Sequence, residues 1–225
     1  MILSGALDLL LPRRCLGCGR MGAYFCTDCL PKLQRIGHAC PLCARPLDER
    51  HAALCEGILP PGLDGLASAF VFEGIIREAV HQFKYNNLKD IAPALSRFMF
   101  EQMLAAGIVA DMIVPVPLHA SRLKERGYNQ TELLSRHLSH LSGLPAESRL
   151  LVRVKPGAPQ AKSARVEERR ANVGGAFICY NKFQGGTVLL LDDVATSCST
   201  LSATAMALKA AGVKRVLGLT IAREI

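Results

Sequence analysis

The stretch "VLLLDDVATSCST", residues 188–200, decides the fold class of this chain. Its four consecutive aliphatic residues are typical of a strand that is covered on both faces, as in a parallel sheet. Asp192 and Asp193 follow at the carboxyl end of that strand, where open α/β sheets bind their ligands. Small hydroxylated residues come next, and apolar residues then recur at helical spacing from Leu201 to Leu208. The stretch therefore predicts a strand, a polar loop and a helix N-terminus, which together form an anion site beside two carboxylates.

Length and composition indicate a globular protein without a membrane anchor. The 225 residues allow one large domain or a large and a small one, and half of them are hydrophobic. No apolar run approaches the roughly 20 residues that span a bilayer, so we expect no membrane span. The opening "MILSGALDLLLPRR" places its charge after the apolar stretch, which argues against a secretory signal. We therefore expect a cytoplasmic protein.

The net charge of +8 points to a polyanionic partner. Nucleic acid, a phosphorylated metabolite and an acidic membrane surface are the classes that such a charge attracts. The alternative is a solvated surface that is simply basic. The sequence contains no block of consecutive Lys or Arg residues, so it does not predict a disordered basic arm.

Seven of the nine cysteines lie between Cys15 and Cys55. In a reducing compartment this clustering favours a metal site over a disulfide framework. Two CxxC pairs, Cys15 with Cys18 and Cys26 with Cys29, supply the four thiolates of a tetrahedral zinc site. Four thiolates leave no open coordination position, so we expect the zinc to be structural.

The ligands of a second zinc site are less complete. The remaining cysteines of the cluster are Cys40, Cys43 and Cys55, and Ile58 stands where another CxxC pair would end. Either His51 or His38 could supply a fourth ligand, or the second site is empty. A cross-braced arrangement, in which Cys40 and Cys43 join the first CxxC pair, is the other possibility.

The Pro/Gly-rich stretch "GILPPGLDG" predicts a domain boundary. We expect a single or double zinc ribbon over residues 1–58 and an α/β domain over residues 59–225. Asn129 is a candidate N-cap for one of the helices of the second domain. The expected helices span residues 74–85, 90–107 and 130–143, and the expected strands lie within 111–120, 149–154 and 214–223. Alternation of strands and helices predicts a parallel sheet flanked by helices.

Four further segments carry a resemblance to a known family. They are "FKYNN", "VPVPLHASRLKERGYNQ", "PQAKSARVEERRANVGGAF" and "LTIAR". Together with the stretch at residues 188–200, which resembles the PRPP-binding motif of type I phosphoribosyltransferases, they make the chain similar to the ComF family from Cys15 to Arg223. The resemblance implies a type I phosphoribosyltransferase-like domain joined to an N-terminal zinc ribbon.

The resemblance also implies the roles of the residues in the motif. Asp192 and Asp193 would engage the ribose hydroxyls of PRPP and a diphosphate that carries Mg²⁺. The loop after them would hold the 5-phosphate at a helix N-terminus. Cys198 stands where the family usually has glycine, and a positive φ there would cost roughly 1 kcal/mol or more. The implied PRPP-binding residues are Asp192, Asp193, Ala195, Thr196, Ser197, Cys198, Ser199 and Thr200.

Basic residues elsewhere are candidates for binding the diphosphate. Arg122, Lys124 and Arg126 follow the "PVP" strand, where this fold has its pyrophosphate loop. By analogy with glutamine amidophosphoribosyltransferases, residues of a flexible loop would close over the diphosphate and exclude water. These flexible-loop candidates are Lys155, Gln160, Arg165 and Arg169.

Two hypotheses of function follow. The first is a Mg²⁺-dependent phosphoribosyltransferase whose acceptor the sequence does not identify. The second is a non-catalytic module that keeps only the PRPP fold and binds single-stranded DNA, with competence or DNA-processing proteins as partners. ComF relatives are associated with DNA uptake in natural transformation, and the charge of +8 suits that role, although only 5% of residues are aromatic and could stack on bases.

Overall fold

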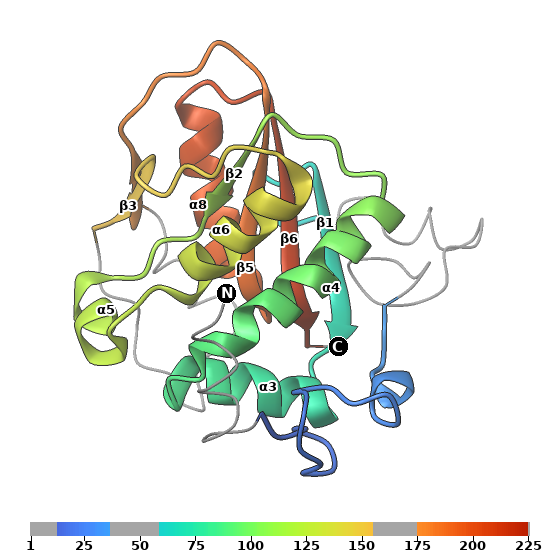
Figure 1. Ribbon diagram of the computed structural model, residues 1–225. Helices are drawn as coiled ribbons and strands as arrows, with labels where there is room; N and C mark the ends of the chain where they lie inside the picture. The colour runs from blue at the N-terminus through green and yellow to red at the C-terminus, as the bar shows by residue number, and fades with distance from the viewer. Residues whose placement is uncertain (1–12, 37–58, 155–174, 225) are drawn as a thin grey trace.

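The centre of the protein is a four-stranded parallel sheet (Figure 1). The computed structural model describes residues 13–36, 59–154 and 175–224. The strands stand in the order β1 (Gly65–Val71), β6 (Arg215–Arg223), β5 (Thr187–Ala195) and β2 (Met112–Pro115), and every neighbouring pair is parallel. The parallel α/β sheet that the sequence predicts is therefore confirmed, with the stretch at residues 188–200 beginning in a central strand.

Helices cover both faces of this sheet. The first face is covered by α4 (Ala92–Ala105) and α6 (Gln130–Ser142), and the second by α8 (Ser199–Ala210) (Figure 1). Because successive side chains of a strand point to opposite faces, Leu189 and Leu191 of β5 join the core under α4 and α6. Leu190 joins the core under α8. Such burial on both sides explains the continuous aliphatic run.

The remaining elements lie at the carboxyl end of the sheet and in the N-terminal segment. The side chain of Asn129 accepts a hydrogen bond from the N–H of Thr131, so the predicted N-cap of α6 is confirmed. The other elements are η1 (Leu30–Lys32), α3 (Gly74–Tyr85), η2 (Lys89–Ile91) and α5 (Ala120–Arg126). The apolar face of α3, which consists of Ile76, Ala79, Val80 and Phe83, is fully buried.

Three strands depart from the sequence-based expectation, and one of them, β4 (Phe177–Cys179), was not predicted as a strand. The segment that contains β1 reads "GLASAFV", without an aliphatic run, and the sequence did not predict it as a strand. One of its small residues is Ser68, whose hydroxyl is hydrogen-bonded inside the sheet, 2.7 Å from the hydroxyl of Thr220. The predicted strand at 149–154 forms β3 (Leu151–Arg153), but it pairs antiparallel with β4 (Phe177–Cys179) outside the main sheet.

The N-terminal segment, residues 13–36, packs against the free edge of β1. The N–H of Ile36 donates to the carbonyl of Ala69 at 3.1 Å, and the N–H of Val71 donates to the carbonyl of Gln34 at 2.9 Å. Phe98 of α4 makes edge-to-face contacts with Phe25 at 5.2 Å and with Phe70 at 5.1 Å between ring centroids. This segment and the α/β domain therefore share one hydrophobic core.

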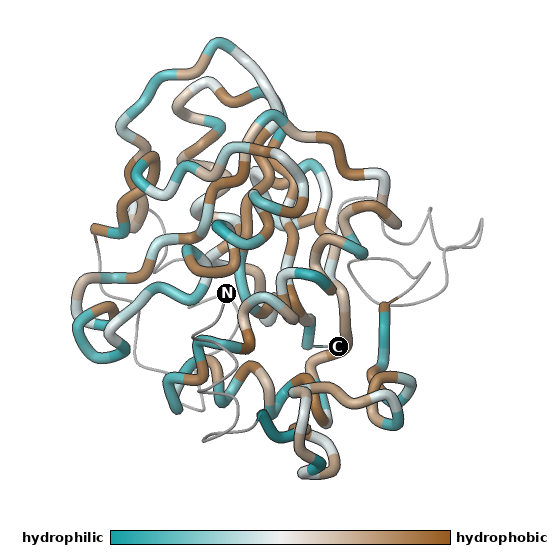
Figure 2. The backbone as a smooth tube through the Cα atoms, viewed as in Figure 1, coloured by the Kyte–Doolittle hydropathy of each residue, from teal (hydrophilic) through white to brown (hydrophobic). Residues whose placement is uncertain are grey.

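Hydropathy follows the same layers (Figure 2). Apolar residues run along the central strands, and α5 is largely hydrophilic. Among the residues that the structure describes, no helix has the length and apolarity needed to cross a membrane.

Candidate functional site

The two carboxylates of β5 stand where the strand extends past its neighbour. Strand β2 ends at Pro115, opposite Leu191, and the next residues of β5 are Asp192 and Asp193. Asp193 is buried, while Asp192 is half-buried and accepts a hydrogen bond from the N–H of Asp193 at 2.9 Å. The strand thus carries both acidic groups into the cleft at its carboxyl end.

This cleft has a volume of about 850 Å³ and is formed by α3, α5, β3 and the end of β5. The guanidinium of Arg126 lies 5.0 Å from the ring centroid of Tyr85, which links α5 to α3 across one wall. The basic residues that line the cleft are Arg77, Lys84, Arg122, Arg126 and Arg153, and the acidic ones are Glu78, Asp192 and Asp193. An excess of cations around a carboxylate pair suits a ligand that carries both phosphate groups and hydroxyls.

Lys84 of α3 forms an ion pair with the buried carboxylate of Asp193. The Nζ atom lies 2.8 Å from Oδ1 of Asp193, and only 19% and 11% of the two side chains are exposed. An ion pair with so little solvent contact is screened less than one at the surface. Lys84 therefore compensates one of the two negative charges at the end of β5.

Asp192, the other carboxylate of the pair, has a raised pKa. Burial, and then the charge of Asp193, raise the pKa of Asp192 from its ordinary 3.8 to about 7, although the charges of Lys84 and Arg153 act in the opposite direction. Asp192 therefore titrates near neutral pH.

The loop after β5 encloses a small hollow next to the main cleft. Asp192, Val194 and residues 196–201 line this hollow, whose volume is about 40 Å³, whereas Ala195 is buried and does not line it. The hydroxyls of Ser197 and Ser199 lie 2.9 Å apart, and α8 begins at Ser199. The first N–H groups of a helix have no partners within the helix, so this loop has the build of an anion site.

Cys198 has a positive φ, the backbone conformation that is expected where the family usually has glycine. It is the N-cap of α8 in the left-handed region, with φ of +55°. Its side chain is buried in the core under α8, and burial raises the pKa of its thiol. A buried thiol with a raised pKa is a poor nucleophile, so the structure disfavours a reactive role for Cys198.

The structure places most of the predicted ligand residues that it describes in the cleft or in the adjoining hollow. Arg122 and Arg126 line the cleft, whereas Lys124 lies on the exposed side of α5 and does not. The flexible-loop candidates Lys155, Gln160, Arg165 and Arg169 lie outside the described residues.

Lys84, Arg153 and Arg77 are cleft residues that sequence reasoning did not select. The signal for Lys84 was present in the segment "FKYNN", which was used for the resemblance without a role for its lysine. Arg153 gave no signal, because the segment around it reads as an ordinary strand.

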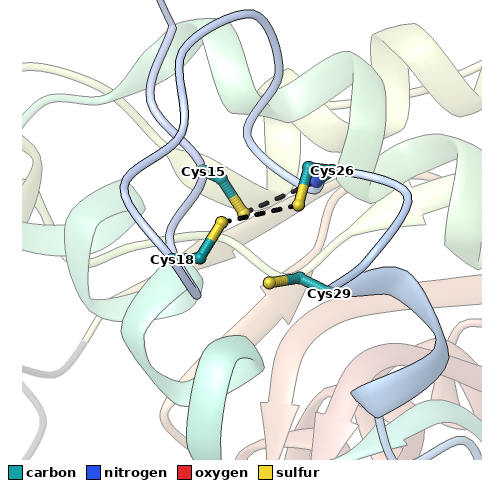
Figure 3. A group of neighbouring side chains, drawn as sticks. All are labelled: Cys15, Cys18, Cys26 and Cys29. Carbon is teal, nitrogen blue, oxygen red and sulfur yellow. Dashed lines mark hydrogen bonds between the residues drawn. The ribbon is translucent and has the colours of Figure 1, made fainter.

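The cysteine cluster forms a second candidate site, on the N-terminal segment. The sulfur atoms of Cys15, Cys18, Cys26 and Cys29 point toward one another (Figure 3) and all lie within 4.8 Å of one another. Tetrahedral zinc with Zn–S bonds of about 2.3 Å requires sulfurs roughly 3.8 Å apart. A small contraction of the cluster would therefore accommodate zinc. The cysteines considered for a second site, Cys40, Cys43 and Cys55, lie outside the described residues.

The electrostatics of the cluster also suit a cation. Burial acts to raise the pKa of Cys15, but hydrogen bonds from the backbone of Cys26, Gly17 and Cys18 lower it to about 6. Burial and hydrogen bonds with the other thiols raise the pKa of Cys29 to about 12. A zinc ion would favour the thiolate form of all four groups.

Comparison with known proteins identifies one matching domain family and several relatives. Residues 6–59 match the family described as "Double zinc ribbon domain". The chain is 33% identical over 200 residues to DNA utilization protein YhgH of Salmonella typhi, which covers 85% of this chain and 86% of that protein. It is 28% identical over 219 residues to competence protein F of Haemophilus influenzae (93% and 90%), and 29% identical over 192 residues to competence protein ComFC of Bacillus subtilis (78% and 74%).

Among solved structures, the chain is similar to glutamine phosphoribosylpyrophosphate amidotransferase from B. subtilis. The TM-score is 0.39 at 18% identity, over 58% of this chain and 26% of that one. Adenine phosphoribosyltransferase from Leishmania tarentolae gives a TM-score of 0.35 at 13% identity, over 62% and 74%.

The fold and the two sites define an α/β protein with a parallel sheet, a cleft at its carboxyl end in which basic residues surround a carboxylate pair, and an N-terminal four-cysteine ribbon. The identity with YhgH over most of both chains shows that the chain belongs to the ComF/YhgH family.

Zinc content tests the cysteine cluster. We expect a Cys15→Ser/Cys26→Ser double variant to contain one zinc equivalent per chain less than the wild type, because two of four thiolates are lost. Elemental analysis of the purified proteins measures this difference. Cys179→Ser, a cysteine on β4, serves as the control and should keep its full zinc content. An unchanged zinc content in the double variant would contradict the assignment.

Replacement of Cys198 tests the strain at the start of α8. Cys198→Ala removes the thiol but keeps a side chain at positive φ, whereas Cys198→Gly also relieves the backbone. We expect the glycine variant to have a free energy of unfolding about 1 kcal/mol higher than that of the alanine variant, measured by urea denaturation.

Ala203→Gly, in the interior of α8, is the matched control and should lower stability by about 1 kcal/mol. A Cys198→Gly variant that is less stable than Cys198→Ala would show that the loop carries no strain.

Proposed function

We propose that this protein binds PRPP with Mg²⁺ in the cleft at the carboxyl end of β5, and that it acts in the cytoplasm in the use of imported DNA. The observation that carries the proposal is the convergence of three groups on one cleft. These groups are the acidic pair Asp192 and Asp193, the loop at the N-terminus of α8, and the five basic residues of the lining.

Each part of PRPP has a chemical partner in this cleft. The loop at residues 196–200 would bind the 5-phosphate through N–H and hydroxyl donors, and Asp192 would accept hydrogen bonds from the ribose hydroxyls. Arg122 and Arg126 would bind the diphosphate through charge-assisted hydrogen bonds. Carboxylate and phosphate oxygens are the ligands that Mg²⁺ prefers, and the ion would neutralise part of the diphosphate charge when bound.

The chemistry that follows PRPP binding would be transfer of the phosphoribosyl group to an acceptor, with release of diphosphate. The arginines would stabilise the charge that develops on the leaving diphosphate. The acceptor is not identified by these residues, so release of diphosphate in the presence of candidate acceptors tests catalysis separately from binding.

A role in DNA use is supported by the names of the relatives, a DNA utilization protein and two competence proteins. The net charge of +8 favours the second candidate, a non-catalytic module that binds single-stranded DNA. The two candidates make different predictions, because phosphate contacts with DNA weaken steeply as salt rises and do not require Asp192.

Calorimetric titration of PRPP with Mg²⁺ into the zinc-loaded protein tests the proposal. We expect binding to the wild type and at least a tenfold loss of affinity for Asp192→Asn/Asp193→Asn, since hydrogen bonds to charged groups contribute about 1.5–3 kcal/mol each. Arg122→Ala should also weaken binding, whereas Lys124→Ala, on the exposed side of α5, is the matched control. No PRPP binding, together with salt-sensitive binding of single-stranded DNA, would favour the second candidate.

The affinity for PRPP should depend on pH through Asp192. Its pKa is raised to about 7, so the carboxylate that accepts the ribose hydroxyls is mostly protonated at pH 6 and mostly ionised at pH 8. We expect the affinity to increase over this window, by at most about tenfold per pH unit, and the additional increase to be absent in Asp192→Asn. Titrations in one buffer series at constant ionic strength measure this dependence.

Stability of the unliganded protein should change in the opposite direction. Because the folded-state pKa of Asp192 is raised, its contribution to the free energy of unfolding is present at low pH and is lost as pH rises through about 7. The groups whose charges act on Asp192 are Asp193, Lys84 and Arg153.

An affinity for PRPP that is constant from pH 6 to 8, or that changes equally in Asp192→Asn, would contradict this role of Asp192.

A further inference from the structure

Lys84 is held in place by residues at the start of α6 and just before it. The hydroxyl of Tyr128 donates a hydrogen bond to the carbonyl of Phe83, and Nε2 of Gln130 donates to the carbonyl of Lys84 at 3.5 Å. The rings of Phe83 and Tyr128 also pack edge to face, 5.8 Å apart. The last turn of α3 is thus fixed relative to the cleft, unlike that of a helix whose end is free in solvent.

The ammonium group of Lys84 consequently occupies a defined position at the acidic pair. It lies 2.8 Å from Oδ1 of Asp193, and both side chains are largely shielded from water. In such surroundings a unit charge acts strongly on its neighbours. A divalent ion bound between the two carboxylates would have to displace this ammonium group or lie beside it.

The charge balance disfavours such an ion in the absence of another ligand. Mg²⁺ needs oxygen ligands that offset its charge and usually keeps several waters. When both carboxylates are ionised, the group formed by Asp192, Asp193 and Lys84 carries a net charge of −1. Arg153 acts on Asp192 as a further cation. The pair by itself therefore offers a divalent ion little net attraction.

We propose that the Lys84 ammonium is the resident cation of the acidic pair, so that the protein alone does not hold a divalent ion there. Asp193 would then remain paired with Lys84 when the ligand binds, and the phosphate oxygens of that ligand would supply the oxygen ligands of Mg²⁺. This inference deepens the proposed function and rests on it for the identity of the site, because it assigns how the metal is supplied. Lys84 is a positioning residue in this scheme.

Binding of Mn²⁺ to the zinc-loaded protein without PRPP, followed by electron paramagnetic resonance, tests the inference. We expect Lys84→Met to bind Mn²⁺ at least tenfold more tightly than the wild type, because the competing charge is removed. Lys84→Arg keeps the charge and should show no gain. Lys209→Met removes the lysine that pairs with Asp64 at 2.6 Å, away from the cleft, and should also show no gain.

Loss of the gain in a Lys84→Met/Asp193→Asn variant would assign the new Mn²⁺ site to the acidic pair and support the inference. Equal Mn²⁺ affinity of Lys84→Met and the wild type would overturn it. A wild-type Mn²⁺ site that disappears in Asp192→Asn would overturn it as well, and this measurement stands even where Lys84→Met does not fold. Since PRPP is absent, these outcomes are separate from a failure of PRPP binding.

Discussion

The placement of two carboxylates at the end of a buried parallel strand is the constraint on which the rest of the site depends. A strand that is covered on both faces can expose charged groups to a ligand only near its ends, and the neighbouring strand β2 stops opposite Leu191. Asp192 and Asp193 therefore meet at the rim of the core, where ionisation is costly. Lys84 offsets one charge through an ion pair, and the other carboxylate responds with a raised pKa.

The N-terminal segment is joined to the α/β domain by more than a linker. Residues 34–36 extend the hydrogen bonding of β1, and Phe25 packs in the same core as Phe98. The guanidinium of Arg35 lies over the ring of Phe98 at 5.5 Å and pairs with Glu101 of α4. This arrangement protects the edge of β1 and couples the order of the cysteine cluster to that of the sheet.

The sequence predicted the parts of the site that are local in the chain. A strand, two carboxylates, a loop of small residues and a helix follow one another between residues 188 and 210, so their order alone implies their geometry. The two CxxC pairs are similarly local, and their sulfurs do converge. Positive φ at Cys198 was anticipated only through its departure from a family glycine.

The contacts between distant segments could not be predicted in this way. Lys84 lies at the end of an amphipathic helix, a position that usually carries a solvated lysine, and only the packing of α3 brings it to Asp193. Arg153 reaches the cleft because β3 leaves the main sheet and pairs with β4. Strand β1 was not predicted because small residues and a buried Ser68 give no aliphatic pattern.

The most direct test of the account is a crystal structure of the protein with PRPP and Mg²⁺ bound. The account predicts that the 5-phosphate lies within hydrogen-bonding distance of the N–H groups of residues 196–200. It further predicts that the ribose hydroxyls face Asp192 and that the diphosphate points toward Arg122 and Arg126. PRPP bound outside this cleft, or bound with its diphosphate in the loop at residues 196–200, would contradict the account.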